Sequence, residues 1–171
     1  MPRKSSLAYK SDYNCTPHAR VTTRIGIIGA GYWAPKFSRS FNDMAGTRVV
    51  AICDINPTKM RPFRAVDPEI GCYGDYRDLI SNSAIDAVVI SIADPERYAV
   101  AEAAMRNNIH VIVQECDSAT EEQVTSLMNT ATETECNVTI VSLPSGGTIS
   151  SMEALPESVA NTIDEFMVNI K

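Results

Sequence analysis

A glycine-rich turn stands near the start of the chain, in the stretch GIIGAGYWA between Gly26 and Ala34. Its G-x-G-x-x-A spacing is typical of the turn that joins a strand to a helix around a dinucleotide. The first glycine permits the tight turn, the second lets a pyrophosphate approach the backbone, and the alanine lets the helix pack closely. Free N–H groups at the start of the helix then bind the diphosphate. The residues expected to contact a dinucleotide here are Gly29, Ala30, Gly31, Tyr32 and Trp33.

An acidic residue follows at the distance that such a turn predicts. Asp54 lies 23 residues beyond Gly31, near the roughly 20 residues expected for a carboxylate that binds the adenosine ribose. Its oxygens accept hydrogen bonds from the ribose hydroxyls and repel a 2′-phosphate, so NAD is favoured over NADP as the cofactor. The alternative is a turn of the same shape that no longer binds any ligand.

The elements that position these residues are short apolar runs alternating with helical stretches. The runs lack polar alternation, as expected for strands covered by helices on both faces. The expected strands are 24–28, 49–53, 72–73 (an edge strand), 87–91, 110–113 and 138–141. The expected helices are 34–44, 58–64, 76–81, 94–107 capped by Asp94, 118–134 with a Ser118–Glu121 capping box, and an amphipathic 157–170. This order predicts an α/β fold, a Rossmann doubly wound parallel sheet with strand order 3-2-1-4-5-6.

Several segments together resemble the N-terminal domain of the glucose–fructose oxidoreductase / inositol dehydrogenase (Gfo/Idh/MocA) family. The resemblance covers about 24–143 and is carried by IGIIGAGYW at 25–33, VAICD at 50–54 with Pro57, YGDY at 73–76, IDAVVI at 85–90 and HVIV at 110–113. It implies that this domain binds NAD(P) and that a hydride moves to or from a sugar or related polyol. The Gly-Tyr-Trp form of the turn is similar to the sugar-nucleotide dehydrogenase branch.

The same resemblance identifies two departures from the family pattern. After the fifth strand the family has Glu-Lys-Pro, whose lysine lies beside the nicotinamide and the substrate, and here Glu115 takes the lysine's place. An ammonium donates to a hydroxyl oxygen, whereas an ionised carboxylate only accepts. After the fourth strand, Ile92 and Ala93 replace a Thr-Pro-Pro type of turn, and Arg97 stands where the family has a histidine. Backbone contacts to the dinucleotide are expected to survive at Ile92 and Ala93.

The expected organisation is a basic N-terminal tail at 1–23, a Rossmann domain at 24–143, and a loop and helix at 144–171, without the second domain that holds the substrate in the family. This favours an NAD-binding protein without autonomous dehydrogenase activity, acting as a binding, regulatory or partner subunit. One alternative is an oxidoreductase on a sugar or related small molecule whose active site is completed by another chain, docked through the C-terminal helix. The other is a repurposed, non-redox site around Glu115. Whether the chain is an enzyme is therefore open.

Composition argues against several other classes of function. The chain has 171 residues and a net charge of −6, so it offers no general basic surface for nucleic acid. No apolar run approaches the roughly 18 residues of a membrane span. Only His18 and His110 are histidines and no Cys-x-x-Cys pair is present, so no metal site is expected. Five cysteines without an apolar leader point to a reducing cytoplasm.

Overall fold

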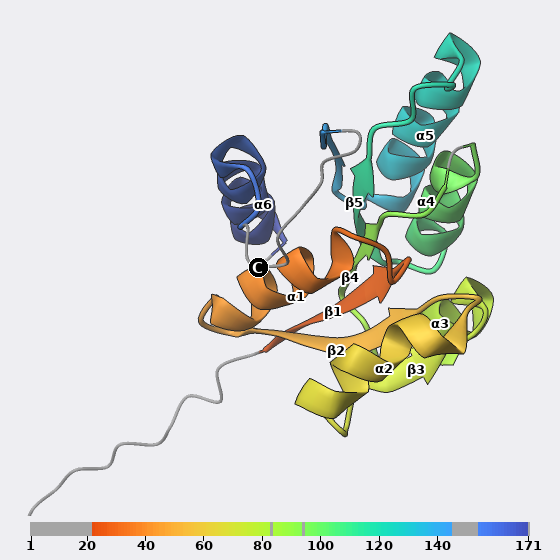
Figure 1. The fold of residues 1–171 in the computed structure, drawn as a ribbon. Coiled ribbons are helices and arrows are strands. Elements are labelled where there is room, and N and C mark those ends of the chain that lie inside the picture. Colours follow the sequence, from red (N-terminus) through yellow and green to blue (C-terminus); the bar gives the residue numbers. More distant parts are fainter. Residues whose placement is uncertain (1–21, 83, 94, 145–153, 171) are drawn as a thin grey trace, which may run out of the picture.

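The structure is a computed structural model that describes residues 22–82, 84–93, 95–144 and 154–170. Its strands form one parallel sheet in the order β3-β2-β1-β4-β5-β6 (Figure 1), which confirms the predicted order and the edge position of the third strand. The strands are β1 (Thr23–Ile28), β2 (Thr47–Cys53), β3 (Gly71–Tyr73), β4 (Ala87–Ile90), β5 (His110–Gln114) and β6 (Val138–Val141).

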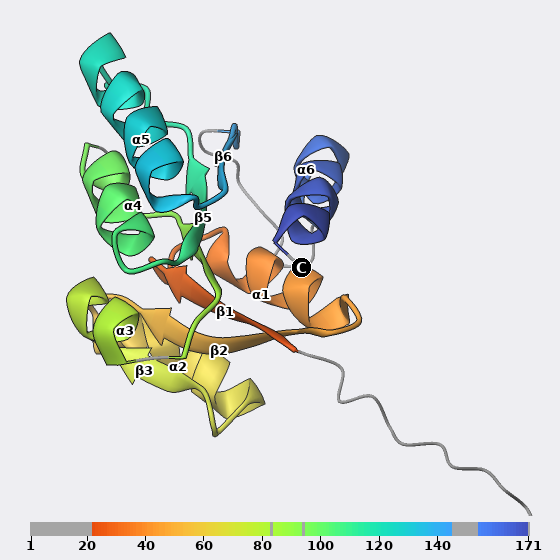
Figure 2. The same ribbon diagram turned by 180° about the vertical axis from the view of Figure 1, so that it is seen from behind.

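Helices cover both faces of this sheet, as Figures 1 and 2 show from opposite sides. The helices are α1 (Ala34–Asp43), α2 (Pro57–Val66), α3 (Tyr76–Asn82), α4 (Arg97–Met105), α5 (Glu121–Thr134) and α6 (Glu157–Asn169). Side chains of α1, α2 and α6 share one apolar cluster, and those of α3, α4 and α5 share the other. Because both faces are covered, all four residues of β4 are buried, which explains why the strand sequences do not alternate.

Two helix starts differ from the sequence prediction. Helix α4 begins at Arg97 with Glu96 as its N-cap residue, not after Asp94, which lies outside the described residues. Helix α5 has its capping box at Thr120 and Gln123 instead of Ser118 and Glu121. Both candidate pairs in α5 have the same three-residue spacing, so spacing alone does not decide between them. At the pair that forms, Thr120 is extended, with φ −82° and ψ 160°, as is usual for an N-cap residue.

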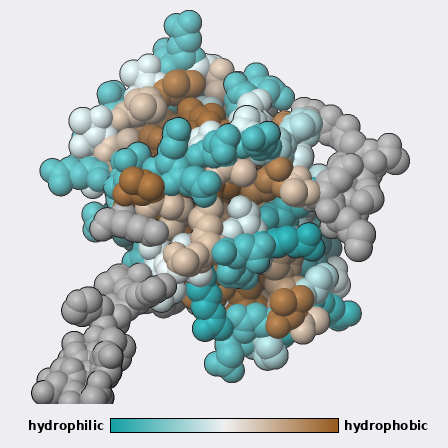
Figure 3. Space-filling model, turned by 90° about the vertical axis from the view of Figure 1, so that its left-hand side faces the viewer, coloured by the Kyte–Doolittle hydropathy of each residue, from teal (hydrophilic) through white to brown (hydrophobic). Residues whose placement is uncertain are grey.

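The C-terminal helix was predicted to be amphipathic, and its apolar side faces the protein's own core. Val159, Ile163, Phe166 and Met167 are at most 3% exposed and pack with residues of α1 and the sheet. Helix α6 therefore closes the face of the sheet that α1 begins to cover (Figure 1). On the side of the molecule that Figure 3 shows, apolar areas are small and interrupted by hydrophilic ones. The apolar residues that suggested a docking surface on this helix are thus used within the fold.

Two sequence expectations concern parts that the structure covers incompletely. The predicted tail at 1–23 is described only at Thr22 and Thr23, and the predicted loop from 144 to 148 only at Pro144. Neither expectation is tested. In the described part of the chain, no helix is long and apolar enough to cross a membrane.

Candidate functional site

The turn after β1 is held tightly against the ends of the neighbouring strands. Gly29 has a φ of +101°, a region that L side chains rarely adopt. Its N–H donates to the carbonyl of Cys53 at 2.8 Å, and a Cβ on it would lie only 2.3 Å from the carbonyl oxygen of Ser91. Glycine is required at this position by the fold itself, because the backbone of Ser91, just after β4, approaches from one side and Cys53 at the end of β2 holds the Gly29 N–H.

Gly31, two residues further on, stands in open space. A Cβ built on Gly31 would meet no protein atom within 4 Å, so packing does not explain a glycine at this position. The N–H groups of Gly31, Tyr32 and Trp33 make no hydrogen bond to another described residue, and they precede the first turn of α1. An open cradle beside free amides at a helix start is the arrangement that accepts a pyrophosphate.

Two aromatic rings and a lysine form the outer part of the turn. The rings of Tyr32 and Trp33 meet edge to face with centroids 4.9 Å apart. The Lys36 ammonium lies 3.7 Å from the centroid of the Tyr32 ring, and Lys36 is only 7% exposed. This cation–π contact fixes the ring pair. Trp33 also packs against the apolar cluster of α1 and α6, while Tyr32 remains 40% exposed at the surface.

Asp54 follows β2 and reaches back to the turn. One carboxylate oxygen accepts the Ala30 N–H at 2.9 Å, and the other accepts the Asn56 N–H at 2.8 Å. Lys59 Nζ lies 3.7 Å from the first oxygen, and the Asp54 side chain is only 8% exposed. The structure therefore brings together the predicted turn and the predicted ribose-binding acid. Lys59 was not predicted from the sequence, although its position on the first turn of the helix after Asp54 suggests that it lies near this carboxylate.

Arg97 ties together the ends of β4 and β5. Its Nε donates to the carbonyl of Ile92 at 2.5 Å, and its Nη1 donates to the carbonyl of Glu115. A second link joins the same two strands, where the Ser91 hydroxyl donates to the Gln114 side-chain oxygen at 3.0 Å. The sequence placed Arg97 at this edge, but its bonds to two carbonyls depend on a tertiary contact that spacing does not show.

The remaining predicted residues lie at this same edge of the sheet. Ile92 packs near Gly29, because its Cγ2 atom would lie 3.0 Å from a Cβ on that glycine, and Ala93 is exposed beside it. The side chain of Glu115 is exposed, and its backbone N–H donates to Val141 at 2.8 Å. A carboxylate on a fixed backbone therefore occupies the end of β5.

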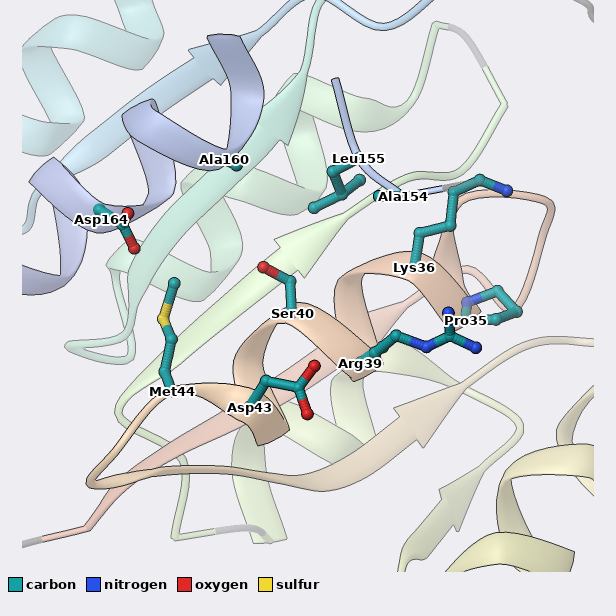
Figure 4. A pocket seen from close by; sticks show the side chains of 10 residues that line it. All are labelled: Pro35, Lys36, Arg39, Ser40, Asp43, Met44, Ala154, Leu155, Ala160 and Asp164. Atoms are coloured by element: carbon teal, nitrogen blue, oxygen red, sulfur yellow. The ribbon is translucent and has the colours of Figure 1, made fainter. Parts of the chain in front are cut away.

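Two pockets flank α1 and α2. One of about 350 Å³ runs between α1 and α6 (Figure 4) and contains none of the predicted cofactor-contacting residues. The other, of about 420 Å³, includes Asp54 and lies between the end of β2 and α2. Only the second pocket adjoins the proposed ribose acid, so it is the one relevant to a dinucleotide.

The cysteines that the structure describes are not joined by disulfides. They are Cys53, Cys72, Cys116 and Cys136. Burial raises the pKa of Cys53 to about 12, with the carboxylates of Asp75, Asp54 and Asp78 adding to the effect. That thiol therefore stays protonated and contributes packing. Among the described residues, no group of three or more His, Cys, Asp or Glu side chains is arranged to hold a metal ion.

Comparison with known proteins identifies the domain. The model of the family described as "Oxidoreductase family, NAD-binding Rossmann fold" matches residues 23–142. A glycosyl hydrolase family 109 protein of Shewanella amazonensis is 31% identical over 123 residues, covering 67% of this chain and 27% of that protein. The inositol 2-dehydrogenase of Salmonella typhimurium is 33% identical over 98 residues, covering 55% of this chain and 29% of that protein.

Solved structures share the fold at lower sequence identity. An oxidoreductase of Agrobacterium radiobacter in complex with NAD⁺, L-tartaric acid and magnesium superposes with a TM-score of 0.64 at 20% identity, over 69% of this chain and 34% of that one. The WlbA dehydrogenase of Bordetella pertussis, in complex with NADH and UDP-GlcNAcA, gives 0.65 at 17% identity, over 70% and 37%. The chain thus spans about a third or less of the length of the relatives it matches.

Proposed function

Because the chain belongs to the oxidoreductase family with an NAD-binding Rossmann fold, we propose that it binds NAD at this edge of its sheet and transfers no hydride by itself. The observation that carries the second half of the proposal is Glu115, which stands where the family pattern has a lysine. The first half rests on family membership, on the open space at Gly31 and on the position of Asp54 next to the turn.

The residues of the site fit a dinucleotide. The amides of 31–33 would bind the pyrophosphate, and Gly31 leaves room for it. The carboxylate of Asp54 would accept from the ribose hydroxyls, with the Ala30 and Asn56 amides holding its oxygens in place. The end of β4, at Ile92 and Ala93, would line the path toward the nicotinamide. When bound, the nicotinamide ring supplies a position that gives or accepts a hydride.

Glu115 changes what the end of β5 can do to a substrate. Its backbone N–H is bonded to Val141, and its carbonyl is bonded to Arg97. The backbone at this position is therefore held in place, and the departure from the family pattern lies in the side chain. An ionised carboxylate only accepts hydrogen bonds. It cannot supply the positive charge that stabilises an alkoxide as a hydride leaves its carbon, and it repels that alkoxide. The oxidation of a polyol is therefore disfavoured at this site.

This chemistry favours a binding, regulatory or partner role. We propose that another protein chain recognises this protein when NAD is bound to it. The buried apolar side of α6 is unavailable for that contact, so a partner would have to use another surface. We also propose that the protein works in the cytoplasm, which agrees with four described cysteines that form no disulfide.

A second candidate is an oxidoreductase on a sugar or related small molecule whose site is completed by residues outside the matched domain or by another chain. The matched segment is 27% and 29% of the length of two relatives, which are thus more than three times as long, and this difference favours the second candidate. A repurposed non-redox site would use the carboxylate of Glu115 as an acid or base. These candidates share the NAD site with the first proposal. They differ from it in the role that they give to the side chain of Glu115.

A turnover assay on variants of Glu115 separates the candidates. Wild type, Glu115→Lys and the charge-removing control Glu115→Gln are mixed with NAD and a panel of inositols, hexoses and sugar acids, and NADH is followed by absorbance. The proposal predicts no NADH from any of the three. In a binding module no substrate is held beside the nicotinamide, so restoring the lysine supplies only one of the two things that hydride transfer needs. NADH from Glu115→Lys alone would favour the second candidate, and NADH from the wild type would overturn the proposal.

A further inference from the structure

The pocket between α1 and α6 is lined by one face of α1 on one side and by the C-terminal segment on the other (Figure 4). Its volume of about 350 Å³ lies within the range of about 300–1,000 Å³ that is typical of small-molecule sites. The residues from α1 and its C-cap recur every three or four positions, which places them on one side of the helix. They are Pro35, Lys36, Arg39, Ser40, Asp43 and Met44.

Lys36 is the buried charged residue of this pocket. It is only 7% exposed, and no carboxylate among the described residues forms an ion pair with it. Its ammonium lies 3.7 Å from the centroid of the Tyr32 ring and 5.5 Å from that of the Trp33 ring. These rings occupy one side of an ammonium that has three N–H donors. Because a nearly buried charge without a carboxylate partner is costly, an anion bound beside Lys36 would be favoured.

The charges of the pocket are separated along α1, with the cations first and the acids after them. Arg39 follows Lys36 by one turn, whereas Asp43 and Asp164 of α6 lie toward the other end of the pocket (Figure 4). In the part of the chain that the structure describes, Arg39 and the two aspartates form no ion pair. At about 1.5 Å per residue, Asp43 lies about 10 Å from Lys36 and about 6 Å from Arg39 along the helix axis.

From this arrangement we propose that the pocket binds a small ligand with a carboxylate at one end, an ammonium at the other and an apolar chain between them. The carboxylate would lie against Lys36 and Arg39, where charge-assisted hydrogen bonds hold it. The ammonium would lie against Asp43 and Asp164, and Leu155 would contact the chain. The pocket contains none of the residues expected to contact NAD, so the inference does not depend on the proposed dinucleotide function.

The separation of the charges sets the length of the ligand. An α-amino acid carries both charges on one carbon and reaches only one end of the pocket. A chain of six bonds between the nitrogen and the carboxyl carbon is as long as two extended residues, about 7 Å. This length falls between the two separations along α1, and ε-aminocaproate has such a chain. It is therefore the probe for this site.

NMR titration of the isotope-labelled protein with four compounds tests the proposal. ε-Aminocaproate carries both charges, caproate keeps the carboxylate alone, hexylamine keeps the ammonium alone, and free glycine carries both charges on one carbon. The variants are Lys36→Met and Asp164→Asn. Their matched controls are Arg48→Met and Glu165→Gln, which remove an exposed cation and an exposed acid that do not line the pocket. Unfolding midpoints of all five proteins establish that each variant is folded.

We expect ε-aminocaproate to shift the amide signals of 36–44 and 154–164 with a dissociation constant in the millimolar range, as suits so small a ligand. It should bind about tenfold more tightly than hexylamine, about two- to fivefold more tightly than caproate, and more tightly than free glycine. Lys36→Met should weaken it by about tenfold, because a nearly buried charge is lost. Asp164→Asn should weaken it by about two- to fivefold, because this acid is exposed, and both controls should bind as wild type does.

Three results would overturn the inference. If ε-aminocaproate shifts none of these amides up to tens of millimolar, the pocket takes no such ligand. If caproate or free glycine binds as tightly as ε-aminocaproate, the two ends of the pocket do not act together. If Lys36→Met and Asp164→Asn bind as tightly as wild type, or no more weakly than their controls, the charges of the pocket do not recognise the ligand.

Discussion

The two glycines of the turn should respond in opposite ways to the same added methyl group. A Cβ on Gly29 would lie 2.3 Å from a backbone oxygen, and Gly29 has a φ of +101°. A Cβ on Gly31 would meet no protein atom within 4 Å, and its φ is not in the left-handed region. Gly29→Ala therefore strains the protein, whereas Gly31→Ala only fills the space reserved for a ligand.

The expected magnitudes follow from these environments. Gly31→Ala should leave stability unchanged or raise it by up to about 1 kcal/mol, because alanine restricts the unfolded chain more than glycine does. It should weaken NAD by about 10- to 150-fold, since the methyl group displaces at least one charge-assisted hydrogen bond to the pyrophosphate, worth about 1.5–3 kcal/mol. Gly29→Ala should lower the free energy of unfolding by at least about 2 kcal/mol, through strain and overlap.

Urea unfolding and NAD calorimetry on wild type and the two variants measure both effects. Gly31→Ala should separate binding from stability, which no general defect in folding would do. Undiminished NAD binding by Gly31→Ala would refute the placement of the pyrophosphate at this turn. A loss of stability in Gly31→Ala as large as that in Gly29→Ala would refute the description of the space around Gly31.

Three further changes test other parts of the description. Arg97→Ala should speed amide hydrogen exchange at the ends of β4 and β5, because it removes the donors of both carbonyl bonds; unchanged exchange would mean that these bonds do not hold the two ends. Thr120→Ala should lower the free energy of unfolding by about 1 kcal/mol, as loss of an N-cap does, and an unchanged urea midpoint would count against the capping box. Burial lowers the pKa of His110, although the negative charge of Asp86 acts in the opposite direction. The imidazole of His110 therefore binds a proton more readily in the unfolded chain than in the folded protein. Stability from this residue is therefore full above pH 6.5 and falls as the pH drops below it; urea unfolding at about pH 7.5 and about pH 5.5 should show a smaller acid loss in His110→Asn than in wild type.

The fold could be predicted because local patterns agree with the global arrangement. Strand sequences without alternation indicated burial on both faces, and β4 is buried along its whole length. The glycine pattern and Asp54 lie far apart in sequence, yet a parallel βαβ unit brings them to the same edge, where Asp54 accepts the Ala30 amide at 2.9 Å. Where two pairs had equivalent spacing, as at the start of α5, the sequence offered no means of choosing between them.

Interactions that depend on side-chain reach could not be predicted in the same way. Arg97 was placed at the right edge, but its guanidinium bonds two carbonyls from different loops. Lys59 stands on the first turn of the helix after Asp54, a position that suggests proximity, but only the structure shows that its ammonium reaches the carboxylate. The apolar side of the C-terminal helix has the same pattern whether it covers a core or binds a partner, and only packing shows that it covers the core.

The central claim is that this chain binds NAD at the turn after β1 with Asp54 at the ribose. Calorimetric titration of wild type and Asp54→Ala with NAD tests it most directly, with Asp67→Ala as an acid removed elsewhere and unfolding midpoints as a check on folding. We predict that wild type and Asp67→Ala bind NAD and that Asp54→Ala does not. Failure of the wild type to bind NAD up to millimolar concentration, or equal binding by Asp54→Ala, would contradict the claim.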